Sequence, residues 1–457
     1  MNAGEAPPAD SSVTTRGLRK HIYGLLTLAA VSIVGARIAT APGSFSNNDA
    51  SRWATIRALV DTGSYAIGYR EELPDGTYRD VGIIAQRDWG TIDRVMDPAT
   101  RRFYSSKPTL LPTVLAGEYW LLHSVSLQFE HQRLAVTRAI LATINLIPFA
   151  VYLLVLARLI ERIGTTDWGR LFVFTAAGFG TFISGYLGSL NNHTVAAMGV
   201  LFTVYHCVRI HIDVDRRWWR FVLAGVFAGW AFCNDLPAGA LAVGLTLWLA
   251  RVAPRQTLRF AVPALLVPVA ALAWTQYLAI GVPFPTYAQA AWYEFAGSYW
   301  LNPGNIDLAD EHKLVYAANL LIGHTGILSL TPVLLLGWVG AVRTATHGPN
   351  PASGGDAARV LAVLTLVLTL ATFVFYVFRT ETYGGKTVGP RWFFWLVPLW
   401  LLTMLPEADR WASSSRRRRL AGLLLVASIA TASFALANPW QPSPLLIVFR
   451  RLGLVSY

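Results

Sequence analysis

The chain has 457 residues, of which only 14% are charged and 54% are hydrophobic; 38 Lys and Arg against 26 Asp and Glu give a formal net charge of +12. A soluble domain carries about 25% charged residues, so this composition excludes a disordered chain and an ordinary soluble protein. The basic residues form short clusters between apolar runs, which argues against a nucleic-acid partner. The composition therefore indicates an all-α, polytopic membrane protein.

Apolar runs recur that can cross about 30 Å of hydrocarbon at about 1.5 Å per residue. The first follows Arg16, Arg19 and Lys20 and has no convincing signal-peptidase site, so we interpret it as an uncleaved helix. In total we predict about eleven transmembrane helices within one module covering residues 1–457. Their residue ranges are 22–40, 133–157, 171–189, 194–212, 220–234, 237–252, 258–281, 326–342, 358–378, 391–406 and 420–438.

The distribution of Lys and Arg predicts the orientation of these helices, because basic residues accumulate in cytoplasmic connections. Arg-rich connections alternate with turns that have no Arg or Lys: 158–170, 209–220 and 251–259 against 190–193 and 234–236. If the apolar segment 110–125 does not cross the membrane, the Arg-rich connections and the N-terminus all lie in the cytoplasm, as the rule requires. We therefore expect segment 110–125 to lie on, or dip into, the outer membrane surface.

Three external segments follow from this topology. Segment 41–132 is a large first loop that we expect to carry juxtamembrane helices, 282–325 is a second long loop, and 379–391 is rich in Gly and basic residues. The centres of the predicted spans contain few ionisable residues, and no repeat typical of a transporter is evident. This asymmetry favours an enzyme that acts at the outer face. The segments 1–15 and 347–358 are expected to be flexible and non-catalytic.

Common motifs of soluble enzymes are absent from the sequence. It has no G-x-x-x-x-G-K-[ST] phosphate loop and no H-E-x-x-H, C-x-x-C or G-x-S-x-G motif. Cys207 and Cys233 both lie in apolar runs, so neither a disulfide framework nor a zinc site is indicated. An activated donor delivered from within the membrane therefore fits better than a soluble nucleotide sugar.

Three segments in chain order resemble a known superfamily. They are NNDASRWATIRALVDTGSYAI after the first helix, then YSSKPTLLPTVLAGEYWLL, and late in the chain YGGKTVGPR. Together they resemble the GT-C superfamily of lipid-carrier-dependent glycosyltransferases, in particular its bacterial protein O-mannosyltransferase and aminoarabinose transferase branch. The first segment places Asp49 at the acidic position that opens the first external loop in these families, with a juxtamembrane helix at 50–62.

The other two segments match further motifs of the superfamily. Lys107-Pro108-Thr109-Leu110 resembles its Lys/His-Pro-Pro-Leu motif, and 383–391 is similar to a G-G-x-x-x-G-P-R signature. Two departures are that Thr109 replaces the second proline and that Asp49 stands without an acidic neighbour. The sequence therefore leaves metal dependence open. The alternative to a metal-independent enzyme is one in which Asp49 shares a divalent cation with Asp88 or Glu294.

The resemblance implies transfer of a sugar from a polyprenyl-phosphate donor to a glycan, lipid or protein acceptor. It also implies a multi-pass protein of the cell inner membrane whose active site lies on the outer face. Two alternatives stay open: a ligase or polymerase that moves a preassembled lipid-linked glycan, and a lipid or sugar transporter. Membrane lipids are further expected partners, because the run Arg416 to Arg419 suits anionic headgroups.

The expected chemistry assigns roles to several residues. A phosphate leaving group needs cations to stabilise its developing charge, and Lys107, Lys386 and Arg391 are candidates. Asp49 is the candidate base for the acceptor, although it also stands where an N-cap of the next helix would stand. Glycines crowd before Arg391, which is typical of a backbone close to a ligand.

The remaining candidates are substrate-binding residues with structural alternatives. His193 lies in a tight external turn and could equally begin a helix, and Glu294 lies in an aromatic stretch that an interfacial belt also explains. Lys107 could simply snorkel beside a surface helix. The other predicted substrate-binding residues are Arg52, Asp88 and Tyr383.

Overall fold

The computed structural model describes residues 11–304, 307–308, 311–348 and 354–456. Parts of the two segments expected to be flexible, namely 1–10 and 349–353, lie outside these described residues.

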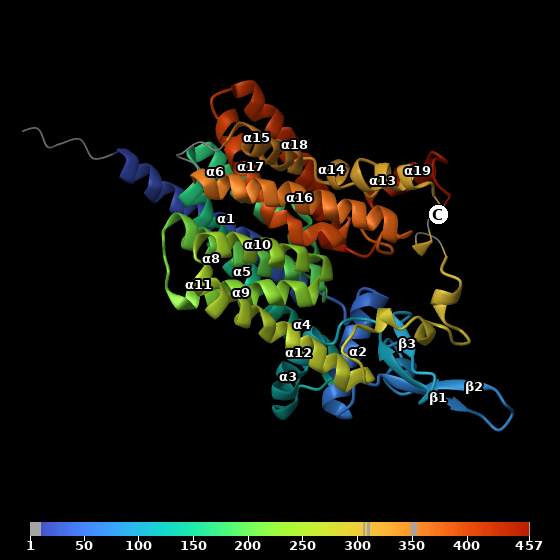
Figure 1. Ribbon diagram of the computed structural model, residues 1–457. Coiled ribbons are helices and arrows are strands. Elements are labelled where there is room, and N and C mark those ends of the chain that lie inside the picture. Colours follow the sequence, from blue (N-terminus) through green and yellow to red (C-terminus); the bar gives the residue numbers. More distant parts are fainter. Residues whose placement is uncertain (1–10, 305–306, 309–310, 349–353, 457) are drawn as a thin grey trace, which may run out of the picture.

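The described chain is mostly helical, and a helix lies at the position of every predicted span (Figure 1). The bundle helices are α1 (Ser11–Ala39), α4 (Phe129–Leu141), α5 (Ile147–Ile163), α6 (Asp167–Phe179), α7 (Phe182–Tyr186), α8 (Asn192–Ile212), α9 (Trp218–Asn234), α10 (Gly239–Val252), α11 (Pro254–Gln256), α12 (Val262–Ile280), α14 (Ile327–Leu330), α15 (Leu334–His347), α16 (Gly355–Arg379), α17 (Val397–Trp411) and α18 (Ser415–Ala437). π-helical turns at Ala142–Leu146 and Thr257–Ala261 connect α4 to α5 and α11 to α12.

Six helices in the described chain are long and apolar enough to cross a membrane: Thr15–Ala39, Phe129–Ile163, Asn192–Ile212, Pro254–Ile280, Gly355–Arg379 and Ser415–Ala437. The chain is thus a multi-pass membrane protein, but the predicted number of eleven spans is not confirmed. The other predicted spans correspond to shorter helices, such as α10 and α15 with 14 residues each. A helix of 14 residues is about 21 Å long, which is less than the hydrocarbon thickness.

Glycines allow pairs of bundle helices to approach backbone to backbone. A Cβ added at Gly225 of α9 would lie 2.1 Å from the carbonyl oxygen of Ala261, which precedes α12. In the same way, a Cβ at Gly340 of α15 would lie 2.0 Å from the carbonyl oxygen of Thr403 in α17. In lipid the hydrophobic effect contributes little to the association of helices. Small residues at their crossings allow the close van der Waals packing that stabilises the association instead. These contacts fix the bundle that carries the site.

Segment 41–132 folds into helices and a small sheet. Helix α2 (Asn47–Asp61) lies at the position of the helix predicted for 50–62, and α3 (Leu110–Ser124) lies at the position of the helix predicted for 110–125. Between them lies an antiparallel sheet of order β2-β1-β4-β3, which the sequence analysis did not predict. Its strands are β1 (Gly68–Glu72), β2 (Tyr78–Val81), β3 (Arg94–Met96) and β4 (Arg102–Ser105).

The sheet is held by ion pairs as well as by its backbone ladder. Arg70 of β1 and Arg94 of β3 both contact Asp80 of β2, at 2.8 and 2.9 Å. Its strands contain only 3 to 5 residues, which is too short for a clear alternating pattern in the sequence. The sheet fixes where the loop after β4 returns to the bundle.

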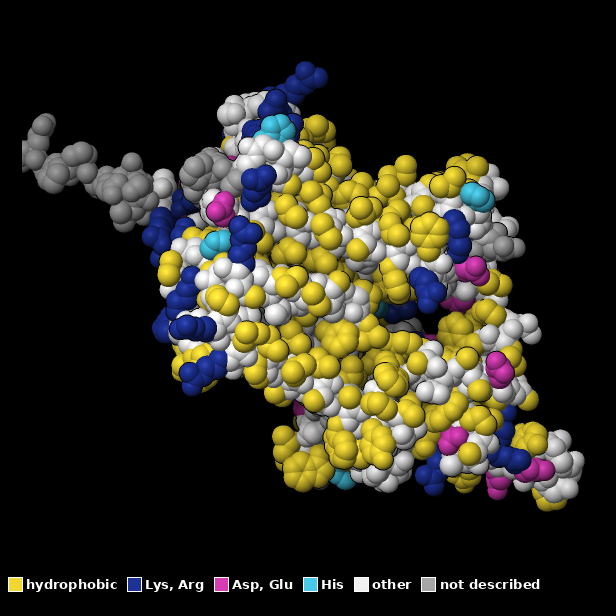
Figure 2. All heavy atoms as spheres, in the orientation of Figure 1, with side chains coloured by type: hydrophobic (Ala, Val, Ile, Leu, Met, Phe, Trp, Pro, Cys, Tyr) yellow, Lys and Arg dark blue, Asp and Glu magenta, His cyan; other side chains and the backbone are white. Residues whose placement is uncertain are grey.

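The two ends of the bundle differ in charge. Figure 2 shows Lys and Arg side chains gathered at one end and apolar side chains covering the middle of the helices. The Arg-rich connections 158–170, 209–220 and 251–259 join helices at one end, whereas the turns at 190–193 and 234–236 join them at the other. The small helices α13 (Lys313–Leu321) and α19 (Pro444–Arg451) lie near the second end, with α2 and the sheet (Figure 1).

We predict that Gly340→Leu lowers the thermal unfolding midpoint of the detergent-solubilised protein, because the new side chain would meet the backbone of α17. Overpacking of this kind costs about 1–3 kcal/mol. The matched control is Gly422→Leu in α18, since a Cβ at Gly422 has no other atom within 4 Å. Equal midpoints for the two variants would contradict the close helix contact.

Candidate active site

Two adjoining cavities lie at the end of the bundle that carries the sheet. Cavity A has a volume of about 590 Å³ and is lined at its far side by Asp307, Lys386 and Trp440. Cavity B has a volume of about 440 Å³ and extends to His193, Asp235 and Tyr376. Figure 2 shows a hollow near this end in which cationic and acidic atoms are visible. The wall that the cavities share is formed by Asn48, Asp93, Lys107, Trp300, Arg391 and Trp392.

Arg52 projects from α2 into cavity B and is only 2% exposed. Its Nη1 donates to the backbone oxygen of Asn48, one helical turn earlier, at 2.9 Å, and also to the Asn48 side chain. Its Nη2 donates to Oδ1 of Asn192 at 2.6 Å. The amide of Asn192 donates in turn to the backbone oxygen of Asn234. Three segments distant in sequence thereby hold one guanidinium in place.

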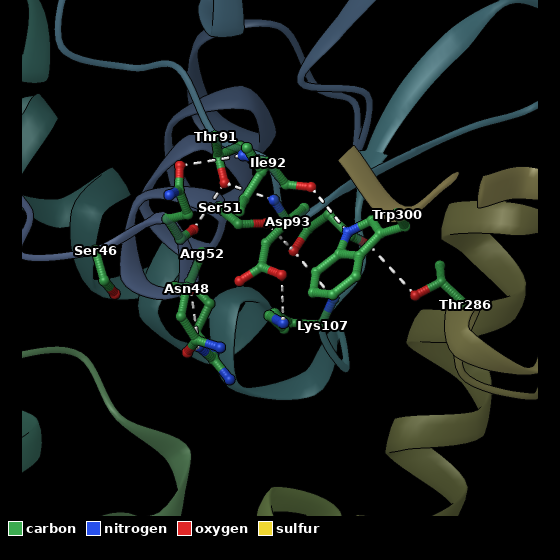
Figure 3. Close-up of polar contacts among 12 residues, drawn as sticks. Ser46, Asn48, Ser51, Arg52, Thr91, Ile92, Asp93, Lys107, Thr286 and Trp300 are labelled. Carbon is green, nitrogen blue, oxygen red and sulfur yellow. Dashed lines mark hydrogen bonds and ion pairs between the residues drawn. The ribbon is translucent and has the colours of Figure 1, made fainter. Parts of the chain in front are cut away.

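Asp93 and Lys107 form an ion pair in the wall between the cavities, with Oδ1 of Asp93 and Nζ of Lys107 2.9 Å apart (Figure 3). The backbone around Asp93 is held firmly: its oxygen accepts from the Ser51 hydroxyl at 2.6 Å, and its N–H donates to Thr91 Oγ1 at 3.0 Å. The indole of Trp300 donates to the preceding carbonyl, that of Ile92, at 3.0 Å. These bonds join α2 and the segment after α12 to the backbone just before β3, and so hold Asp93 in place.

Arg391 is oriented by the glycine-rich loop that precedes it. Its Nε and Nη2 donate to the carbonyl oxygen of Gly384 at 3.1 and 2.9 Å, and its guanidinium lies 4.8 Å from the centroid of the Trp440 ring. Gly384 and Gly385 have φ values of +85° and +81°, a conformation that residues with a Cβ rarely adopt. The glycines are therefore required to turn that carbonyl toward Arg391.

Cavity B concentrates positive charge, because Arg52, Lys107 and Arg391 all line it. Burial, together with the nearby charge of Arg391, lowers the pKa of Arg52 to about 10. Burial also lowers the pKa of Lys107, although Asp93 opposes the shift. In the described part of the chain, Arg52 and Arg391 donate hydrogen bonds only to neutral oxygens. Such a group of partly desolvated cations favours a bound anion.

His193 and Asp235 form a buried pair in cavity B. Nδ1 of His193 and Oδ2 of Asp235 are 2.7 Å apart, and the two side chains are 9% and 3% exposed. Asn191 orients the backbone at this point, because its Oδ1 accepts from the His193 N–H at 2.8 Å. His193 thus begins α8, as the structural alternative expected, and also faces the cavity.

Asp49 does not line either cavity. Its carboxylate accepts from the backbone N–H groups of Phe45, Ser46 and Ala50 at 2.8, 2.7 and 3.0 Å, and from the Ser46 hydroxyl at 3.0 Å. With Ser46 it forms a capping box at the start of α2. Burial nevertheless raises the pKa of Asp49. Asp49 therefore has the helix-capping role that the sequence analysis gave as the alternative to a catalytic one.

The other predicted site residues divide into two groups. Five of them line one or both of the cavities: Arg52, Lys107, His193, Lys386 and Arg391. Asp88 and Glu294 are exposed and line neither cavity, and Tyr383 is buried with its hydroxyl donating to Glu311. The residues that sequence reasoning did not select are Asp93, Asp235, Trp300 and Trp392.

The signals for the missed residues were weak. Asp93 stands in a polar loop together with Asp88 and Asp97, and the sequence does not distinguish among them. Only the ion pair with Lys107, 14 positions later, identifies Asp93 as part of the site. Asp235 stands two residues before Pro237 at the head of a predicted span, where the sequence alone favours a helix cap. Both residues acquire their environment from segments far away in the chain.

The described residues contain no group of three or more His, Cys, Asp or Glu side chains that could hold a metal ion. In particular, the acidic residues considered for a shared cation, Asp49, Asp88 and Glu294, do not gather into such a group.

No family model matches the sequence, and no curated protein sequence matches it either. Several solved structures are similar. The oligosaccharyltransferase of Archaeoglobus fulgidus without ligand has a TM-score of 0.46 and 11% identity over 94% of this chain and 60% of its own. The same enzyme, AglB, with an inhibitory peptide and dolichol-phosphate has a TM-score of 0.47 and 11% identity, over 93% of this chain and 56% of its own.

A further similar structure is the arabinosyltransferase EmbB of Mycobacterium smegmatis. It has a TM-score of 0.41 and 14% identity over 91% of this chain and 41% of its own. The chain thus spans 60% or less of the length of these glycosyltransferases. All three TM-scores are below 0.5, so this likeness does not assign a function.

We predict that Asp49→Ala lowers the thermal unfolding midpoint, because it leaves the half-buried N–H groups of Phe45 and Ser46 without their acceptor. Loss of an N-cap acceptor costs about 0.5–2 kcal/mol. The control is Glu294→Ala, which removes an exposed carboxylate that lines neither cavity and should change the unfolding free energy by less than about 0.5 kcal/mol. An unchanged midpoint for Asp49→Ala would refute the capping role.

Proposed function

We propose that the protein is a membrane glycosyltransferase that transfers a sugar from a polyprenyl-phosphate donor to an acceptor at the outer face of the cell inner membrane. The observation that carries this proposal is the group of three cations, Arg52, Lys107 and Arg391, in the wall of two adjoining cavities. The resemblance of three short sequence segments to motifs of GT-C glycosyltransferases supports the same function.

The cations suit the leaving group of this reaction. When the bond between the anomeric carbon and the phosphate oxygen breaks, the lipid phosphate gains a negative charge. Charged donors fixed in a partly buried site stabilise such charge without reorganising. Guanidinium groups can contact two phosphate oxygens at once, so we assign Arg52 and Arg391 to the phosphate and Lys107 to the oxygen that leaves the sugar.

The surroundings of cavity B suit the lipid part of the donor. Tyr376 of α16 and Tyr287, which follows α12, line this cavity. Beside them, Phe375 and Phe378 of α16 are 48% and 68% exposed, and Tyr277 of α12 is 52% exposed. A polyprenyl chain can lie along these apolar helix faces while its phosphate reaches the cations. The two cavities together then have room for the donor sugar and the acceptor.

A ligase that transfers a preassembled lipid-linked glycan is the second candidate function. Cavity A, with about 590 Å³, falls in the range of about 300–1,000 Å³ that is typical of sites enclosing a whole drug-sized ligand. It therefore has room for more than a single sugar. The transporter alternative has less support, because the charged residues of the site gather at one end of the bundle and not at mid-depth.

We predict that Arg391→Gln and Arg52→Gln each reduce sugar transfer at least about 100-fold, in line with the loss of one charged group that stabilises the transition state. The measurement is transfer of radiolabelled sugar from a panel of polyprenyl-phosphate monosaccharides by membranes with matched expression. Arg87→Gln is the control, because Arg87 lies in the same external segment with its side chain 96% exposed.

The panel also separates the candidate functions. Donor consumption by the wild type that both Arg variants lose supports the proposed reaction. Absence of consumption with every monosaccharide donor, together with activity on a lipid-linked oligosaccharide, would favour the ligase. Full activity of the Arg variants would contradict the assignment of the phosphate site.

A further inference from the structure

We propose that His193, oriented by Asp235, is the catalytic base of the transfer reaction and accepts the proton of the acceptor hydroxyl at its Nε2. This inference rests on the proposed function and adds a catalytic residue to it.

The geometry of the pair leaves one ring nitrogen available. Because the Asp235 carboxylate accepts a hydrogen bond at Nδ1, the neutral imidazole carries its proton there and has a lone pair on Nε2. In the described part of the chain, Nε2 of His193 has no hydrogen-bond partner. The His193 side chain lines cavity B, so this lone pair is available to a substrate.

Asp235 supports the charged form of the base. Once His193 is protonated, its imidazolium lies 2.7 Å from a carboxylate oxygen, which stabilises the charge and prevents ring rotation. A nucleophile, a base and a group that orients the base form the common arrangement in acyl and group transfer. Here the acceptor hydroxyl takes the place of the nucleophile, and Asp235 is a positioning residue.

An unpartnered polar atom beside the pair indicates that a ligand completes this part of the cavity. Asn234 is 4% exposed and lines cavity B, and its side-chain Oδ1 is buried without a hydrogen-bond partner. A buried acceptor without a donor is costly. A sugar hydroxyl beside His193 would supply the missing donor.

Asp93 is a weaker candidate for the same role. Its carboxylate is committed to Lys107 at 2.9 Å, so taking up a proton would remove the charge that holds this cation in the wall. Asp49 is surrounded by backbone N–H donors and lines neither cavity. His193 is free of both constraints.

The step is balanced as follows. The acceptor oxygen forms a bond to the anomeric carbon, and the bond from that carbon to the phosphate oxygen breaks with its electron pair going to the lipid phosphate. The acceptor proton moves to Nε2 of His193. The imidazolium later releases this proton to water, and the neutral base is restored.

Several charged and titratable groups share the surroundings of His193. Arg52 of α2 and Arg391, at the start of the 3-10 helix Arg391–Leu396, act on it through their charges, and Asp235 opposes them. The other titratable groups that line the same cavity are Asp93, Lys107, Tyr287, Tyr293 and Tyr376. The Asp235 carboxylate is the only one of these groups that hydrogen-bonds to the imidazole in the described chain.

The first test measures initial rates of transfer between pH 5 and pH 9 with the polyprenyl-phosphate sugar that the wild type consumes. We expect the wild-type rate to rise with pH as His193 loses its proton. His193→Gln should reduce kcat by about 10²–10⁴-fold, change the KM for the donor little, and abolish this rise. Asp235→Asn should reduce kcat less and move the rise to lower pH, because the imidazolium loses its anionic partner.

His206→Gln is the matched control, since His206 lies in the same helix but contacts Arg220 near the opposite end of α8. It should keep the wild-type rate and pH profile. Wild-type transfer that His193→Gln retains would overturn this inference alone. Absence of transfer by the wild type would overturn the proposed function and this inference with it.

A second measurement does not depend on turnover or on the folding of a variant. Diethyl pyrocarbonate acylates an unprotonated ring nitrogen, so the folded wild type should be modified at His193, as located by peptide mass spectrometry. Undecaprenyl phosphate should protect this site and leave modification of the exposed His131 unchanged. An unmodified His193, or no protection, would contradict a free Nε2 beside the phosphate.

Discussion

The ion pair between Asp93 and Lys107 is the interaction on which the arrangement of the site depends. It lies in the wall that separates the two cavities, and it joins the turn before β3 to the turn before α3. Without the carboxylate, Lys107 would face Arg52 and Arg391 with no anion to offset their repulsion. The pair therefore allows three cations to gather around cavity B before any substrate is bound.

The arrangement also depends on amides that connect the ends of α8 and α9 to α2. Asn192 at the start of α8 accepts from Arg52 of α2 and donates to the end of α9. Hydrogen bonds to neutral amide and carbonyl oxygens position the guanidinium without cancelling its charge. The same two helix ends carry His193 and Asp235, so the groups assigned to the phosphate and to proton transfer share one support.

The sequence predicts the helical framework well, because an apolar run of about 20 residues is a local property of composition. The basic residues of the site were also predicted, since Lys107 and Arg391 stand in recognisable motifs. Asp93 and Asp235 could not be predicted in the same way, because their roles arise from partners 14 and 42 positions away. Asp49 shows the reverse case, in which a local capping box with Ser46 accounts for its carboxylate. The short sheet left no clear signal, because its strands have only 3 to 5 residues.

The shared wall has a consequence for the order of events in a transferase of the proposed kind. Since the cavities adjoin across Asp93, Lys107 and Arg391, donor and acceptor have separate space and meet at one boundary. Both can be bound together, so the sugar has no need to rest on a protein side chain between them. The enzyme would then follow sequential kinetics through a ternary complex, with a single displacement that inverts the configuration of the anomeric carbon.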